Sequence, residues 1–381
     1  MSGTAETDAG PGQPLSGVRV LDLTRLAPGP YATLILADLG AEVVKLEPPE
    51  GDATRAMPPG GAGELFAALN RGKRSVVLDL KRPAAVEAVR RILGRCDVLV
   101  EGFRPGVMDR LGLGHAALRD AFPRLVICAV SGFGQTGPDR GRAGHDLGYA
   151  ARAGLLAMGG RDGAPAIPGA QVADIGAAWV AVSGILAALL ARAASGCGRL
   201  VDVSLVESAT SFAALHLGPA LLGFPVPPAG QGMLDGGLPS YGLYRTADDR
   251  WLAVGALEPK FFAALCERLG VGDLTAEAYG GGEGAERVRA LLTRTFAAAS
   301  LATWLERLAG LDACVEPVLS AEEVRADRHL GSRGLFPRPG VLATPLHLGP
   351  PAAAPAPGLG EHTREVLSEA GLTPAEIDAL G

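Results

Sequence analysis

The sequence predicts an α/β fold in which a large first domain, built on a Rossmann-like parallel sheet, is followed by a smaller α+β domain. Short β-branched runs alternate with helical periodicities over roughly the first 220 residues, which is typical of a doubly wound sheet. A chain of 381 residues, 48% of them apolar, can bury a sizeable core and is longer than most single domains. A Pro- and Gly-rich stretch at residues 223–232 then interrupts the pattern, as domain boundaries do.

The first elements illustrate the pattern. Residues 18–23 read as a strand, and a helix follows up to residue 39, with prolines at its start and Gly40 at its end. Residues 41–47 read as a second strand, so the chain opens as a strand–helix–strand unit with a right-handed crossover. The further elements expected in this domain are strands at residues 75–80, 97–101, 125–130 and 199–205 and helices at 83–93, 150–156, 176–194 and 208–222.

The second half predicts a smaller domain and a returning tail. Runs at residues 241–246 and 251–256 flank an acidic turn and predict a hairpin, with helices expected at 260–269, 285–298 and 301–308. The predicted organisation is a disordered tail (1–14), a large domain (15–222), a linker (223–232), a small domain (233–320), an extended linker (321–357) and a C-terminal helical segment (358–381) that returns to the large domain.

Composition excludes several classes of function. A net charge of −6 argues against a general nucleic-acid binder. Neither the spacing G-x-G-x-x-G nor the spacing G-x-x-x-x-G-K-[ST] occurs, so the sheet is expected to bind no dinucleotide in the usual way. Five scattered cysteines predict reduced thiols in a cytoplasmic protein, and the apolar stretch 177–190 is too short to span a bilayer.

Two short stretches offer side chains that transfer protons. His145 and Asp146 follow Gly144, and Asp174 stands 29 residues after His145 among small residues that let a bulky ligand approach. The pattern points to acid/base chemistry on a large substrate. A structural interpretation stands beside it, because a histidine next to an aspartate, or an aspartate before a long apolar helix such as Asp174, also suits a helix cap.

Several motifs resemble one known superfamily. They are Leu-Ser-Gly-Val-Arg-Val-Leu-Asp-Leu at residues 15–23, Ala-Asp-Leu-Gly-Ala-Glu-Val-Val-Lys at 37–45, Asn-Arg-Gly-Lys-Arg-Ser at 70–75 and Gly-Phe-Arg-Pro-Gly at 102–106. Together they resemble the family III CoA-transferase superfamily of CaiB/BaiF type. The motifs at residues 143–146, 233–237, 256–259 and 312–315 are similar to its α-methylacyl-CoA racemase branch, and Gly-Glu-His-Thr at 360–363 extends the likeness to the tail.

The resemblance implies a racemase that inverts the α-carbon of a 2-methylacyl-CoA through an enolate. His145 and Asp174 match the branch's two proton-transfer groups, which act from opposite faces of the α-carbon. Glu258 matches an acid that orients or stabilises the charged His145, and Asp146 matches an adjoining acid that supports the site. Coenzyme A enters as part of the substrate, with no metal, redox cofactor, nucleic acid or membrane. The resemblance also implies an interlocked homodimer whose site lies between one subunit's large domain and its partner's small domain.

Coenzyme A carries phosphates that need cations or helix N-termini. The cations that follow strands, where ligands of open α/β sheets bind, are Lys45, Arg55, Lys73, Arg74 and Arg104. Arg104 and Arg74 are the favoured contacts and Lys73 follows them. The alternative for all five is a solvated loop charge.

Two other functions stay open. A CoA-transferase of the same superfamily would use Asp174 as a nucleophile and pass CoA between carboxylic acids through an aspartyl-CoA intermediate. A non-catalytic acyl-CoA binder would be expected to lose the pair of His145 and Asp174. The resemblance favours the racemase because the transferases usually lack a histidine at this position. Departures from the racemase pattern at Gly148, Trp179 and Gly242-Leu243 concern the identity of the acyl chain.

Overall fold

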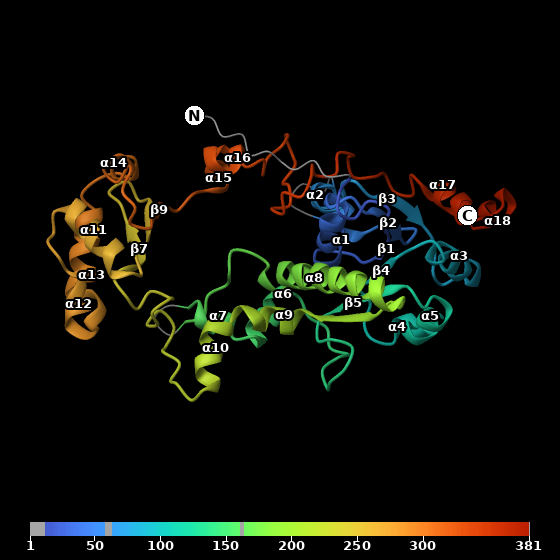
Figure 1. Ribbon diagram of the computed structural model, residues 1–381, viewed down its shortest axis with the longest axis horizontal. Helices are drawn as coiled ribbons and strands as arrows, with labels where there is room; N and C mark the ends of the chain where they lie inside the picture. Colours follow the sequence, from blue (N-terminus) through green and yellow to red (C-terminus); the bar gives the residue numbers. More distant parts are fainter. Residues whose placement is uncertain (1–11, 58–62, 161–163, 381) are drawn as a thin grey trace. The chain divides into compact units, whose positions relative to one another are not determined.

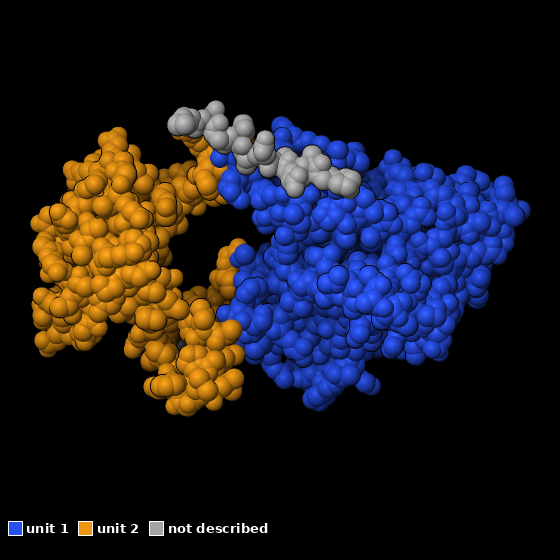
Figure 2. All heavy atoms as spheres, in the orientation of Figure 1, with its two compact units in different colours: residues 1–153, 170–212, 331–381 blue, residues 154–169, 213–330 orange. Residues whose placement is uncertain are grey.

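The structure, a computed structural model, describes residues 12–57, 63–160 and 164–380. The chain forms two compact units (Figure 2). The first contains residues 1–153, 170–212 and 331–381, and the second contains residues 154–169 and 213–330. The change of unit at residue 212 precedes the boundary expected at residue 222, and residues 154–169 join the second unit. Most of the tail predicted over residues 1–14 lies outside the described residues.

A six-stranded sheet forms the centre of the first unit, and the predicted α/β class is confirmed. Its strands are β1 (Arg19–Leu23), β2 (Glu42–Glu47), β3 (Arg74–Val77), β4 (Val98–Glu101), β5 (Val126–Ser131) and β6 (Leu200–Ser204). Their order is β3-β2-β1-β4-β5-β6, and every neighbouring pair is parallel. The order reverses between β1 and β4, and ligands of such sheets bind at the carboxyl ends of the strands at this switch point.

Helices cover both faces of this sheet (Figure 1). On one face α1 (Pro28–Asp38) packs against α8 (Val172–Ser195), and both contact the strands. The other face buries one apolar cluster, to which five helices contribute: α3 (Pro83–Leu93), α4 (Val107–Arg110), α5 (His115–Ala121), α17 (Thr363–Glu369) and α18 (Pro374–Asp378). Because successive side chains of a strand point to opposite faces of the sheet, each strand packs against the helices on both faces.

Helix α8 is the longest helix in the first unit. It starts four residues before the expected residue 176, and it ends at Ser195, before Gly196, which has a φ of 73°. Among the described helices, α8 alone is long and apolar enough to cross a membrane by length and composition. It packs on α1, α9 (Leu205–Phe212), β5 and β6, which is the position of a core helix.

The C-terminal segment returns to the edge strand β3. The backbone N–H of His362 donates to the carbonyl of Ser75 at 2.9 Å, and the N–H of Val77 donates to the hydroxyl of Thr363 at 3.0 Å. The segment therefore supplies partners for backbone groups of an otherwise open edge. Before it, the stretch expected to be extended from residue 321 begins with two short helices, α15 (Ala321–Ala326) and α16 (Arg328–Ser332).

The second unit has its own sheet and core. Strands β7 (Tyr241–Arg245) and β8 (Trp251–Gly255) form an antiparallel hairpin, and β9 (Val315–Pro317) pairs with β8. Four helices, α11 (Pro259–Leu269), α12 (Thr275–Gly280), α13 (Gly282–Phe296) and α14 (Leu301–Arg307), pack with this sheet around one apolar core. The indole of Trp304 donates to the carbonyl of Phe296 at 2.8 Å inside this core.

The remaining elements include two helices where one was expected. The predicted helix 150–156 is divided into α6 (Asp146–Arg152) and α7 (Leu155–Met158), because Gly154 between them adopts a φ of 81°. The predicted helix 208–222 is likewise divided into α9 and α10 (Ala214–Leu221). A short 3-10 turn, η1 (Ala53–Arg55), and helix α2 (Glu64–Asn70) follow β2.

Candidate active site

Helix α6 presents His145 at its first turn. The histidine occupies the N-cap position with extended backbone (φ −132°, ψ 169°), and its side chain is exposed. The side chain of His145 makes no capping hydrogen bond, so the imidazole does not cap the helix. The interpretation of His145 as a helix cap therefore has no support in the side-chain contacts.

Asp146 joins the two stretches that sequence analysis singled out. Its Oδ1 accepts hydrogen bonds from the backbone N–H groups of Ala173 and Asp174, at 2.7 and 2.9 Å. Both donors belong to the first turn of α8, whose N–H groups have no partner inside the helix. A carboxylate from α6 thus caps α8 and brings His145 and Asp174 to one place, although Asp146 lies 27 and 28 residues from its two partners in the sequence.

Asp174 has the electrostatic environment of a functional carboxyl. Burial and the nearby charge of Asp146 together raise its pKa to about 6, against the opposing charge of His145. Two carboxyl groups that share a site disfavour each other's ionisation, and desolvation adds to this effect. The group therefore changes its protonation close to neutral pH, which is where a general acid or base is most effective.

Tyr149 is a site residue that sequence analysis missed. Its buried ring packs edge-on against Phe133, with the ring centroids 5.4 Å apart. A Cβ on Gly132 would lie 2.3 Å from the Tyr149 hydroxyl, and one on Gly144 would lie 2.7 Å from its ring. Burial and the charge of Asp174 raise the pKa of Tyr149, while Arg104 lowers it. The two glycines were the signal available in the sequence, because both make room for this ring.

Arg104 lies in the loop that follows β4, at the switch point of the sheet. Its side chain is exposed, and within the described part of the chain its guanidinium makes no hydrogen bond or ion pair with a protein group. Its charge acts on Tyr149, which in turn is affected by Asp174. The structure therefore leaves this predicted coenzyme A contact open to an anion.

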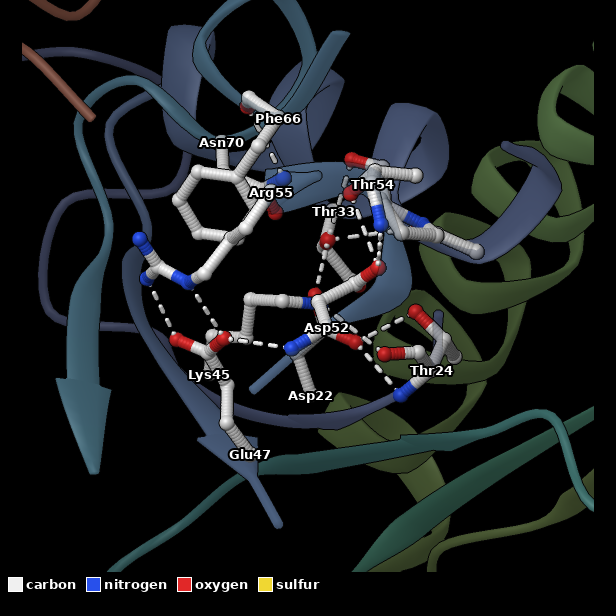
Figure 3. A network of polar contacts seen from close by, with 12 residues as sticks. Asp22, Thr24, Thr33, Lys45, Glu47, Asp52, Thr54, Arg55, Phe66 and Asn70 are labelled. Atoms are coloured by element: carbon white, nitrogen blue, oxygen red, sulfur yellow. Dashed lines mark hydrogen bonds and ion pairs between the residues drawn. The ribbon is translucent and has the colours of Figure 1, made fainter. Parts of the chain in front are cut away.

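Lys45 and Lys73 differ from the expected loop cations, since both amino groups are fully buried. Figure 3 shows the polar network around Lys45, whose Nζ donates to the carbonyl of Thr24 and pairs with Asp52, both at 2.9 Å. The alternative of a solvated loop charge is wrong for both lysines, because Asp52 and Asp22 pair with them inside the fold. Their expected contact with coenzyme A stays a prediction, one that this burial does not favour.

Lys73 is held by four protein oxygens. Its Nζ lies 3.1 Å from Asp22 Oδ2 and donates to the carbonyl of Pro30, the hydroxyl of Thr33 and the amide oxygen of Asn70 at 2.7–2.9 Å. Burial lowers the pKa of Lys73 to about 8 against the attraction of Asp22. Burial alone would raise the pKa of Asp22, but Lys73 and Lys45 lower it to about 2.

Arg55 and Arg74 also have protein partners. Arg55 forms a two-pronged pair with Glu47, at 2.8 and 2.7 Å, and stacks over the ring of Phe66 at 3.6 Å (Figure 3). Arg74 starts β3, at the amino edge of the sheet, and pairs with three acids: Glu42, Glu365 and Glu369. Their expected contact with coenzyme A stays a prediction, one that this geometry does not favour.

Glu258 belongs to the second unit. It is exposed at the N-cap position of α11, where it makes no capping hydrogen bond through its side chain. Burial and the charge of Glu258 raise the pKa of Cys314. Its predicted effect on His145 stays a prediction.

The positions that depart from the racemase pattern differ in whether their surroundings explain the residue found there. Trp179 packs edge-on against Tyr31, with ring centroids 6.4 Å apart, and so joins α8 to α1. A Cβ on Gly148 would meet open space, and one on Gly242 would lie 3.5 Å from the guanidinium of Arg289. Nothing around Gly148 requires glycine.

Comparisons with known proteins give one consistent family. The model of CoA-transferase family III matches residues 15–363. Alpha-methylacyl-CoA racemase of Mus musculus is 40% identical over 376 residues, covering 95% of each chain. Succinyl-CoA:glutarate CoA-transferase of Mus musculus is 32% identical over 392 residues, covering 97% of this chain and 89% of that one.

A solved structure supports the same family. A CaiB/BaiF family protein from Brucella suis superposes with a TM-score of 0.83 at 29% identity, covering 94% of this chain and all of that one. Its likeness extends over both units of the chain, as does the match of the family model. The chain is an enzyme, and it belongs to CoA-transferase family III.

Proposed function

We propose that this enzyme is an acyl-CoA racemase or epimerase that inverts the α-carbon of a 2-methylacyl-CoA or a related thioester. The observation that carries the proposal is the pairing of two different proton-transfer groups, His145 and Asp174, at one site ordered by Asp146. The likeness to an alpha-methylacyl-CoA racemase at 40% identity supports the same reaction.

The chemistry needs both groups. A proton α to a thioester carbonyl is weakly acidic, so its removal requires a base held against it, and inversion requires an acid on the opposite face. With its pKa at about 6, Asp174 is largely ionised at neutral pH yet accepts a proton readily. His145 serves as its counterpart, because an imidazole can both accept and donate a proton. In one direction Asp174 takes the proton and His145 returns one, and in the other direction the roles exchange.

The alternative is transfer of CoA between carboxylic acids. Asp174 would then attack an acyl-CoA, form a mixed anhydride and take up CoA as an aspartyl thioester. The likeness to a succinyl-CoA:glutarate CoA-transferase supports this reading. An ionised, partly buried Asp174 suits either reaction, so His145 favours proton transfer: a nucleophilic carboxylate needs no second proton-transfer group.

We propose that the working form is a homodimer. Helix α10 has no buried residue in the single chain, and exposed apolar side chains gather in and around it: Phe212, Leu215, Leu221, Leu222 and Phe224. An unpartnered apolar helix of this kind is typical of an interface between subunits. Sedimentation equilibrium tests the proposal: Leu221→Glu is expected to weaken the dimer, and a monomeric wild-type chain would contradict it.

One experiment separates the two reactions. The enzyme is incubated with a 2-methylacyl-CoA in D2O, with and without a carboxylate acceptor, and both deuterium at the α-carbon and CoA transfer are followed. The racemase is expected to incorporate deuterium without an acceptor, and His145→Ala is expected to confine this incorporation to one enantiomer of the substrate and to stop inversion. CoA transfer without incorporation would overturn the proposal in favour of the transferase. His329→Ala, at an exposed histidine in α16, is the matched control.

A further inference from the structure

A second histidine, His115, lies near the loop of Arg104 and takes no part in the proposed chemistry. Glu101 ends β4, and its carboxylate is buried, with 2% of the side chain exposed. One oxygen, Oε2, accepts from the backbone N–H of Phe103 at 2.8 Å. The other, Oε1, lies 3.1 Å from Nε2 of His115, the first residue of α5.

These two bonds fix the start of a functional loop. Residues 102–106 connect β4 to α4, and they carry Arg104, the predicted coenzyme A contact. Glu101 holds the loop through Phe103, the residue directly before Arg104, and His115 holds Glu101 from α5. Gly102 lies against Thr24 of the loop after β1, where a Cβ would have ordinary contact at 3.6 Å.

The charge of His115 matters because Glu101 is buried. A buried carboxylate without a counter-ion is costly, and within the described residues His115 is the only cationic side chain paired with Glu101. The charged groups that act most strongly on His115 are acids, namely Glu101 of β4, Asp109 of α4 and Asp202 of β6. The hydrogen bond to Glu101 raises the pKa of His115, burial opposes the rise, and the three acidic charges add to it.

We propose that His115 is a positioning residue for the Arg104 loop, and that its charged form strengthens the binding of coenzyme A by holding Glu101 in place. The inference rests on the proposed function, which assigns the phosphates of coenzyme A to this loop. Neutral His115 still donates a hydrogen bond from Nε2, but the buried carboxylate then has lost its counter-ion. The loop becomes less well held, and Arg104 is less often in the position that meets an anion.

The sign of the pH dependence follows. The folded-state pKa of His115 is raised, so the ion pair is complete at low pH and is lost as the pH rises through that pKa. Affinity for coenzyme A is therefore expected to fall over the same interval. A coupling of this kind typically changes affinity by about fivefold or more. The charge of His115 affects how well the loop is ordered for binding and not the chemical step. KM is therefore expected to change, while kcat is expected to stay the same.

The test compares His115→Gln with the wild type. The Nε2 of glutamine donates a hydrogen bond from a similar position but carries no charge. Binding of coenzyme A to the full-length protein is measured by calorimetry between pH 5.5 and 8.5, and the imidazole of His115 is titrated by NMR. Because a phosphate monoester itself titrates near pH 6, about the same in both proteins, the relevant quantity is the difference between variant and wild type.

The wild type is expected to lose affinity as His115 loses its proton, whereas His115→Gln binds weakly and equally at each end of that interval once the phosphate contribution is subtracted. His329→Gln is expected to behave as the wild type. A His115→Gln variant with wild-type affinity and pH dependence would overturn the inference alone. A wild type that binds no coenzyme A at any pH would overturn the proposed function and the inference with it.

A second readout needs no substitution. The amide of Phe103 donates to Glu101, so its protection from hydrogen exchange in the wild type is expected to fall as His115 is deprotonated. Protection that stays constant through the titration of His115 would also overturn the inference.

Discussion

Replacing Asp174 by asparagine is expected to stabilise the protein while it abolishes racemisation. The carboxyl has a pKa of about 6 in the folded chain, compared with 3.8 for an unperturbed aspartate. Between these values the folded chain binds more protons than the unfolded chain, so stability falls as the pH rises through this interval. Above pH 6 the ionised Asp174 lowers the free energy of unfolding, and asparagine, which does not ionise, removes that cost.

The size of the effect follows from the pKa values. A displacement of roughly two units corresponds at most to about 3 kcal/mol. The side chain is partly solvated, and a negative charge in the first turn of α8 gains about 0.3–1 kcal/mol from the helix dipole. The expected net gain for Asp174→Asn is therefore about 1–2 kcal/mol at pH 7.5. It is expected to become small near pH 3.5, where Asp174 is mostly protonated in both states.

Urea denaturation at pH 7.5 and at pH 3.5, at equal protein concentration, measures this difference. Asp146→Asn serves as the matched background, because it removes the neighbouring charge and retains an oxygen that accepts from Ala173 and Asp174. In that background the gain from Asp174→Asn should be smaller, since Asp146 is the second cause of the raised pKa. Equal or lower stability of Asp174→Asn at pH 7.5 would refute the assignment of a destabilised carboxylate.

Three further predictions concern the surroundings of the site. Lys73→Met leaves Asp22 buried without its nearest cation and is expected to cost about 3–5 kcal/mol in chemical denaturation, whereas Lys81→Met on the surface should cost little. Gly132→Ala places a Cβ 2.3 Å from the hydroxyl of Tyr149 and is expected to cost about 1–3 kcal/mol in thermal unfolding and to slow α-proton exchange. Arg104→Ala is expected to raise KM for the acyl-CoA with kcat preserved and to weaken the dependence of KM on salt, as steady-state kinetics would show.

The fold was accessible from the sequence because its signals are local. Alternating strands and helices, prolines at the start of α1 and Gly40 after it determine a parallel sheet with short connections. The exact ends of the helices and strands were harder to predict from the sequence. Helix α8 starts at Val172 because Asp146, distant in sequence, satisfies its first N–H groups, and no local pattern contains that information.

The candidate site could also be predicted only in part. His145 and Asp174 could be singled out because their neighbours are small and because their motifs resemble those of a known branch. The burial of the two lysines could not be predicted, because a sequence shows that Lys45 follows apolar residues but not that Asp52 pairs with it at 2.9 Å. Arg104 remains an open cation, since no acid of the described chain pairs with it. Tyr149 was overlooked because its two glycines lie 17 and 5 residues before it.

The central claim is that His145 and Asp174 act on opposite faces of one α-carbon. Pure (2R)- and (2S)-2-methylacyl-CoA, each incubated in D2O with His145→Ala or with Asp174→Asn, test it most directly. Each variant retains one base, so each is expected to exchange the α-proton of one enantiomer only, and the two variants should have opposite preferences. Loss of exchange for both enantiomers in one variant with retention of both in the other would contradict the account, because a single base would then serve both faces.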